Sequence, residues 1–146
     1  MNWLKELSLN KNLNTNLSDF LSQYGTTGLE HALQLYQNTH QKYICKTRKN
    51  ISQINIYDIY YLEIQKHNIT IHTQHEIYHK YGTLANELQT LSPYGFVRCT
   101  QSCIVSLSKI KHILRDDIIL INNVRLHMSR GYASQVIIAF SQHRPK

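Results

Sequence analysis

From residue 42 onward the sequence alternates short apolar runs with tight polar turns, and this pattern restricts the available folds more than any other feature. Residues 54–64 and 69–73 are rich in β-branched and aromatic side chains, which favour strands. The polar segment Lys66-His67-Asn68 between two apolar runs is typical of a hairpin. Short strands joined by tight turns predict a mainly β fold of small, strongly twisted antiparallel sheets. We expect strands near 43–49, 54–64, 69–73, 76–81, 96–99, 104–107, 110–114, 118–121 and 124–128, with turns at Asn50, Asp116-Asp117 and Asn122-Asn123.

One or two helices are expected to flank these sheets. Thr83 is a suitable cap for a helix that carries a stripe of three leucines and ends at Ser92-Pro93. Ser129 would cap a last helix. The leucines are Leu84, Leu88 and Leu91, and the inner side of the last helix is predicted to carry Tyr132, Val136, Ile137 and Phe140.

Residues 1–41 have a helical pattern instead. Apolar residues follow one helix face up to Tyr24, and Gly25 is placed to end that helix. Thr27 and Glu30 form a capping box for a second helix. Two such short helices cannot bury a core of their own, so they must pack on the rest of the chain or form a dimerisation element. The sequence therefore predicts a helical N-terminal extension, 1–41, ahead of a β-rich domain, 42–146.

Charge is unevenly distributed along the chain. Its 146 residues carry a formal net charge of +7, but residues 1–41 hold two lysines against three carboxylates and are net negative. The excess of basic residues in 42–146 favours a polyanionic partner. A hydrophobic content of 42% excludes a disordered tail. Neither a membrane span nor a signal peptide is evident, so we expect a soluble, cytoplasmic protein.

The cysteines and histidines do not form a familiar metal motif. Cys45, Cys99 and Cys103 contain no CxxC pair and are expected to be reduced thiols, with redox sensing by Cys99 as an alternative. His72, His75 and His79 would share one face of a helix. The surrounding residues favour a strand, in which the last two of these histidines lie about 13 Å apart. We therefore expect solvated strand histidines, no metal site and no cofactor.

Catalysis finds little support in the sequence. Ser102 has no glycine elbow to position a nucleophile. The Asp116-Asp117 pair is explained by a turn, and the five glycines form no phosphate-binding loop. We predict that the protein is not an enzyme and has no small-molecule substrate.

Three residues stand where their side chains could reach the edge of a base. His67 lies in a tight turn, Gln101 follows a strand, and Arg130 begins the last helix. Arginine pairs with guanine, glutamine pairs with adenine, and histidine pairs with guanine or a phosphate. Taken singly, each is more often a solvated side chain, and periodicity alone does not show that the three share a face.

Three motifs, in order over about a hundred residues, resemble the LytTR DNA-binding domain of bacterial transcription regulators. The stretch IYDIYYLEIQKHNITIHT resembles the family's opening, which runs into a turn with a basic residue and histidine. TLANELQTLSPYGFVRCTQSCIVSLSKIKHI resembles its middle, with Phe-x-Arg before a short polar loop. LINNVRLHMSRGYASQV resembles its asparagine-turn, Ser-Arg and Tyr ending.

This resemblance implies a fold of short antiparallel sheets whose loops enter successive major grooves of DNA. It implies that His67, Gln101 and Arg130 contact bases, although family members often carry asparagine where Gln101 stands. Arg98 has an alternative role, since Glu63 or Glu87 could hold it inside the sheet. Candidate phosphate contacts are Lys66, Lys80, Arg98, Ser102, Lys109, Lys111 and Ser129, with Lys46, Arg48 and Lys49 as weaker ones.

Residues 1–41 are too few for the receiver domain that many relatives carry, which needs about 120 residues. The resemblance therefore implies a stand-alone regulator that binds promoter direct repeats as two copies, a homodimer on DNA. Some such regulators are restrained by a small membrane-bound protein, which is a further expected partner. Two other roles stay open. One is non-specific nucleic-acid binding, with tyrosines stacking on single strands. The other is a protein-interaction module that docks an acidic or membrane-bound regulator.

Overall fold

The computed structural model describes residues 9–39 and 41–143, and these form two compact units. In the first unit, α1 (Lys11–Thr39) is a helix interrupted at Gly25, whose φ of 72° and ψ of −171° are not helical. Glycine adopts this backbone conformation at little cost. The predicted break between two helices at Gly25 is confirmed.

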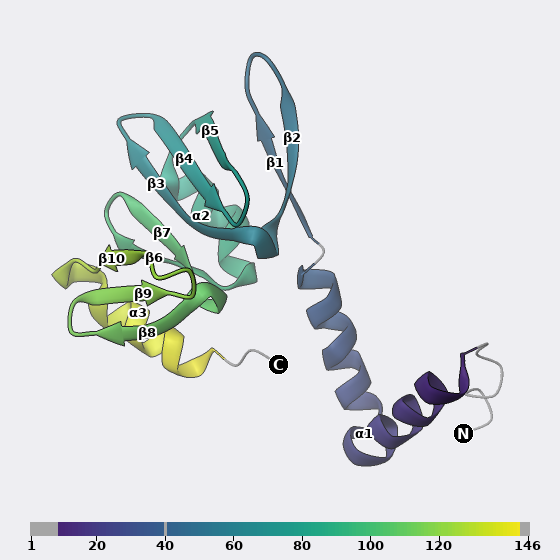
Figure 1. Cartoon of the computed structure of the whole chain (residues 1–146). Helices are drawn as coiled ribbons and strands as arrows, with labels where there is room; N and C mark the ends of the chain where they lie inside the picture. Colours follow the sequence, from purple (N-terminus) through teal and green to yellow (C-terminus); the bar gives the residue numbers. More distant parts are fainter. Residues whose placement is uncertain (1–8, 40, 144–146) are drawn as a thin grey trace. The chain divides into compact units, whose positions relative to one another are not determined.

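The second unit is mostly β, as predicted, with three antiparallel sheets and two helices (Figure 1). Its helices are α2 (Leu84–Leu91) and α3 (Arg130–Gln142). A two-stranded sheet pairs β1 (Lys42–Lys46) with β2 (Ile51–Asn55). A five-stranded sheet has the order β5-β4-β3-β7-β6, with bounds Ile59–Gln65 for β3, Asn68–Thr73 for β4, Ile77–Tyr81 for β5, Phe96–Thr100 for β6 and Cys103–Ser106 for β7. A three-stranded sheet has the order β10-β9-β8, with bounds Ile110–Leu114 for β8, Asp117–Leu120 for β9 and Arg125–His127 for β10.

Two hydrophobic cores hold these layers together. The first lies where α2 packs on β3, β4 and β7, with Ile59, Leu62 and Leu91 fully buried. The second lies between β6, β7, the three-stranded sheet and α3, where Val105, Ile118 and Val136 are inaccessible to solvent. The alternation of side chains along β3 and β7 supplies both cores from one sheet.

Helix α2 forms as the sequence predicts. The Thr83 side chain accepts a hydrogen bond from the backbone N–H of Asn86, which caps the helix. Two of its leucines, Leu84 and Leu91, are buried and a third, Leu88, is partly buried. The amphipathic stripe therefore holds this helix on the sheet.

Four expectations require correction. The strand expected over 43–49 ends at Lys46, since the Thr47 hydroxyl bonds Asn50 and the chain turns there. The run 54–64 is not one strand, because a 3₁₀ helix (Ile56–Asp58) separates β2 from β3 and Asn55 caps it by accepting from the N–H of Tyr57. Ile137 lies on the outer side of α3, 44% exposed. The turn before β9 falls one residue early, at Arg115 and Asp116, because Asp117 begins the strand and pairs with Arg125 at 2.9 Å.

Candidate nucleic-acid interface

Two turns of the five-stranded sheet lie next to each other at one of its ends. Strands β3 and β7 are antiparallel neighbours, with Glu63 opposite Cys103, so the β3–β4 turn and the β6–β7 turn share that end. The backbone N–H of Ile64, near the end of β3, donates to the carbonyl of Ser102 at 2.9 Å, which joins β3 to the β6–β7 turn. Figure 1 shows both turns on the same side of the sheets. We call this the turn end.

The start of α3 is tied to the same end. The N–H of Ser129 donates to the carbonyl of Cys99 at 3.0 Å, near the last residue of β6. The N–H of Met128 donates to the carbonyl of Asp116 at 2.7 Å, which brings the β8–β9 turn alongside. Ser129 occupies the N-cap position of α3, although its side chain makes no capping hydrogen bond. Short backbone bonds thus position the start of this helix beside the β6–β7 turn.

The structure brings the three predicted base-contacting residues to the turn end, each on a different segment. His67 lies in the β3–β4 turn, Gln101 in the β6–β7 turn, and Arg130 begins α3, and all three are exposed. The side chains of Gln101 and Arg130 have no hydrogen bond or ion pair to other described residues, which leaves their polar groups available. The ring of His67 lies 5.4 Å from that of Tyr81, which is 75% exposed.

The β3–β4 hairpin presents His67 by a two-residue turn. Lys66 has a φ of 59° in the left-handed region, which a tight hairpin turn requires. The carbonyl of His67 accepts from the N–H of Gly82 at 2.9 Å, so the turn is also tied to the end of β5. The histidine is therefore held on a rigid element.

Four of the predicted phosphate contacts are accessible. Lys66 and Ser102 are exposed in the two turns, and Ser129 is half-buried at the start of α3. The Ser102 side chain lies 3.4 Å from the hydroxyl of Thr100. Lys111 is exposed, but it lies near the start of β8, away from the β8–β9 turn.

Lys80 is engaged inside the domain. Its ammonium pairs with Glu87 at 2.5 Å, and its side chain is only 17% exposed. It also contacts the hydroxyl of Tyr43 at 3.3 Å, and burial together with Glu87 raises the pKa of that tyrosine. Because Glu87 is itself buried, this cluster joins β1, β5 and α2 rather than reaching outward. The expected phosphate contact by Lys80 is not available in this arrangement.

Lys109 is also buried, with 3% of its surface exposed. Its ammonium lies 4.0 Å from the centre of the Tyr57 ring and 5.1 Å from that of Tyr60. Burial lowers the pKa of Lys109, and the carboxylate of Asp58 partly offsets this. A 3₁₀ helix (Leu107–Lys109) turns the side chain inward, so the structure removes Lys109 from the predicted phosphate contacts.

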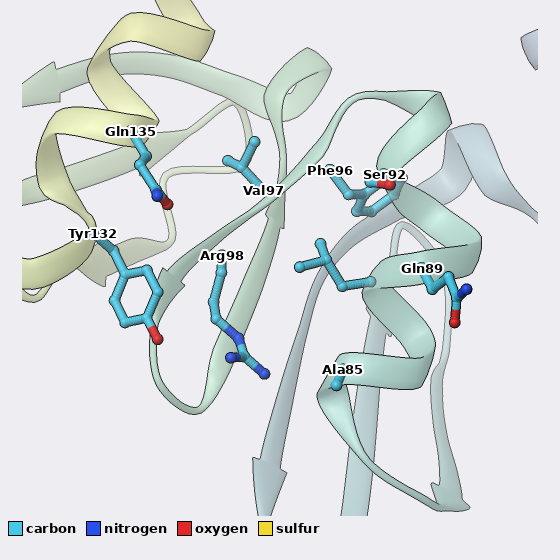
Figure 2. A pocket seen from close by; sticks show the side chains of 9 residues that line it. Ala85, Gln89, Ser92, Phe96, Val97, Arg98, Tyr132 and Gln135 are labelled. Carbon is cyan, nitrogen blue, oxygen red and sulfur yellow. The ribbon is translucent and has the colours of Figure 1, made fainter.

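Arg98 pairs with neither glutamate that the sequence suggested. Glu63 bonds His72 at 2.8 Å and Glu87 bonds Lys80, so both carboxylates are occupied. Arg98 is half-buried on β6, and its Nε has no hydrogen-bond partner within residues 9–39 and 41–143. Figure 2 shows its side chain between α2 and α3.

Arg115 is a basic residue at this surface that the sequence analysis missed. It is exposed in the β8–β9 turn with a φ of 54°, beside the backbone that leads to Arg130. The signal was a basic residue directly before two aspartates. Assigning the turn to those aspartates left Arg115 at the end of a strand.

The histidines and cysteines make local contacts. His72 stacks on Tyr61 with ring centres 4.1 Å apart, and His79 lies 3.4 Å from the Thr70 hydroxyl. No group of three His, Cys, Asp or Glu residues in the described segments is arranged to hold a metal ion. The buried thiol of Cys99 donates to the carbonyl of Cys103 at 3.7 Å. Hydrogen bonding between the two thiols lowers the pKa of Cys99 and, with burial, raises that of Cys103.

The comparisons with known proteins agree with this architecture. A family model described as the LytTr DNA-binding domain matches residues 49–140, more than half of the chain. The chain belongs to the LytTR family. A solved LytTr DNA-binding domain of a putative methyl-accepting/DNA response regulator from Bacillus cereus has the same fold, with a TM-score of 0.57 and 23% identity over 67% of this chain and 94% of that one.

No curated protein sequence matches the chain significantly. Membership of the LytTR family makes this a DNA-binding domain of the kind that serves bacterial transcription regulation. No helix in the described segments is long and apolar enough to cross a membrane.

Proposed function

We propose that this LytTR protein binds promoter DNA sequence-specifically at spaced direct repeats and thereby regulates transcription. The observation that carries the proposal is the gathering of His67, Gln101 and Arg130, from three separate segments, at the turn end. Rigid turns with exposed polar tips suit insertion into the major groove, which carries the full hydrogen-bonding code of the bases. The proposal involves binding alone, without a catalytic step or a cofactor.

Each of the three residues takes a role that its chemistry allows. Arg130 donates two parallel hydrogen bonds to a guanine, and the Gln101 amide pairs with an adenine. His67 reaches a second site along the duplex, a guanine or a phosphate. Because Gln101 is longer than asparagine by one methylene, its preferred base can differ from that of relatives that carry asparagine there.

Phosphate contacts hold the protein in register. Lys66, Ser102 and Ser129 flank the base-reading residues, and Arg115 extends this set toward the β8–β9 turn. Arg98 and Lys111 complete the proposed set from positions further from the turn end. Such contacts raise affinity for all DNA and make it sensitive to salt.

Two copies on tandem repeats double the number of contacts and sharpen specificity. In the first unit, Leu13, Tyr24 and Leu33 of α1 are each more than half exposed. We propose that these apolar side chains mediate dimerisation on DNA or docking of a membrane-bound inhibitory protein. Exposed apolar side chains on the two helical segments of this unit suit either partner.

Selection from a random duplex library, at low and at near-physiological salt, tests the proposed function. Enrichment of a spaced direct repeat that persists at the higher salt is the expected result. An Arg130→Ala variant should lose this enrichment, whereas an Arg48→Ala variant, altered in the exposed β1–β2 turn, should retain it. Binding without enrichment, lost as salt rises, would mean a purely electrostatic surface.

A further inference from the structure

A groove lies between α2, the edge strand β6 and α3 (Figure 2). Its volume of 610 Å³ falls within the range of about 300–1,000 Å³ that small-molecule sites occupy. Leu88 of α2 and Phe96 and Val97 of β6 give it an apolar lining. The groove is therefore large enough, and apolar enough, for the body of one small ligand.

Arg98 gives this groove its positive charge. Its Nε is buried and lacks a hydrogen-bond acceptor in the described part of the chain. Figure 2 shows the guanidinium of Arg98 and the hydroxyl of Tyr132 pointing the same way, toward the β6–β7 turn. A shielded donor without an acceptor is unfavourable, so the site is improved by any anion that reaches it.

The protein does not neutralise this cation from within. The described lining of the groove contains no aspartate or glutamate. Glu63 and Glu87, the two glutamates that the sequence suggested as partners of Arg98, are held by His72 and Lys80. The charge of Arg98 is thus left for a group from outside.

We propose that this groove binds a small organic carboxylate with a flat apolar body. A carboxylate matches the single guanidinium in charge and accepts two parallel bonds from its Nε and a neighbouring Nη. The Tyr132 hydroxyl donates a further bond, and the apolar body rests on Leu88, Phe96 and Val97. A phosphate is a poorer match, since its second charge has no partner and it has no body to fill the apolar lining.

The position of the groove links this site to the turn end. Arg98 of β6 precedes Gln101 of the β6–β7 turn by three residues, and Tyr132 follows Arg130 by two in α3. A bound carboxylate occupies Arg98 and competes with any backbone phosphate for it. Ligand binding itself does not depend on sequence-specific reading of DNA, so the two proposals can fail separately.

Calorimetric titration of the full chain with 2-naphthoate, in the absence of DNA, tests the site. Saturable one-to-one binding is expected. Acetate lacks the apolar body, 2-naphthamide lacks the charge, and inorganic phosphate lacks the body while keeping the charge. Each of these three compounds should bind at least about tenfold more weakly than 2-naphthoate, because each lacks a charge-assisted or an apolar contact. No saturation, or equal binding of phosphate or the amide, would overturn the proposal.

Two variants locate the binding. Arg98→Gln removes the charge and should weaken the binding of 2-naphthoate about tenfold. Arg48→Gln, in the β1–β2 turn, should leave that affinity unchanged. Ala85→Leu fills the groove from an exposed position of α2 and should block binding while leaving thermal unfolding unchanged. Binding of 2-naphthoate that survives both Arg98→Gln and Ala85→Leu would place the ligand elsewhere and contradict the proposal.

Discussion

The two ends of the five-stranded sheet treat their polar groups in opposite ways. At the turn end, Gln101 and Arg130 are exposed and have no side-chain partner among the described residues. At the other end, 3₁₀ helices close the strands and the ammonium of Lys109 lies against the rings of Tyr57 and Tyr60. Polar and basic side chains thus stabilise the fold at one end and remain available at the other. Basic character alone does not identify a DNA contact.

The largest effect should come from breaking the buried ion pair. Lys80→Ala leaves the carboxylate of Glu87 buried and unpaired, and we expect it to cost about 3–5 kcal/mol of unfolding free energy. Lys66→Ala, in the exposed β3–β4 turn, is the matched control and should change stability by less than about 0.5 kcal/mol. Urea denaturation of the two variants measures both values. Equal losses of unfolding free energy in the two variants would contradict the distinction between the buried ion pair and the exposed turn end.

A smaller effect should appear in DNA binding. Arg130→Ala should cost about 1–3 kcal/mol of affinity for the selected duplex and little for mixed-sequence DNA. Lys66→Ala should instead weaken both duplexes similarly and reduce the salt slope by about 0.9. Titrations at several salt concentrations separate these patterns. A uniform loss with Arg130→Ala would make that residue a phosphate contact.

Lys109 should give the smallest effect. In Lys109→Met, removal of a buried ammonium offsets the loss of its contacts with two tyrosine rings, so stability should change by less than about 1 kcal/mol. Specific DNA affinity should not change, because the side chain is buried. A clear loss of DNA affinity in a folded variant would return Lys109 to the interface.

The pH dependence of the same variant checks the cause. Burial lowers the pKa of Lys109, so the folded protein binds fewer protons than the unfolded chain between that lowered value and the usual 10.5. The stability of the wild type relative to Lys109→Met should therefore rise as pH increases through this window. Denaturation of both proteins at neutral and alkaline pH measures the difference. If the stability of the wild type relative to Lys109→Met falls as pH rises, the folded state favours the charged ammonium.

Local signals explain why so much of the fold could be predicted from the sequence. The polar break at Lys66-His67, the cap at Thr83 and the glycine at position 25 each act over a few residues, and each appears where expected. Asn55 shows the limit of this approach. Its cap on a one-turn 3₁₀ helix interrupts a run of β-branched residues, which the strand pattern does not reveal.

The placement of lysines shows what the sequence could not supply. Lys80, in a predicted strand, and Lys109, between two predicted strands, look like surface cations in the sequence. Tertiary contacts with Glu87 and with two tyrosines bring them inside. The contacts of Lys109 join segments far apart in the chain, and the ion pair of Lys80 joins a strand to the following helix. No local spacing encodes either arrangement. His67, Gln101 and Arg130 can each be singled out from residue type and position, but only the family resemblance predicts that they lie together, a relation that periodicity lacks.

The most direct test of the central claim is an NMR map of backbone amide shifts on binding the selected duplex. The account predicts that the largest changes fall at the turn end, around His67, Gln101 and Arg130. Amides near Tyr57 and Lys109, at the opposite end, should stay where they are. Changes centred on the opposite end or on the β1–β2 turn would contradict the assignment of the turn end as the DNA-binding surface.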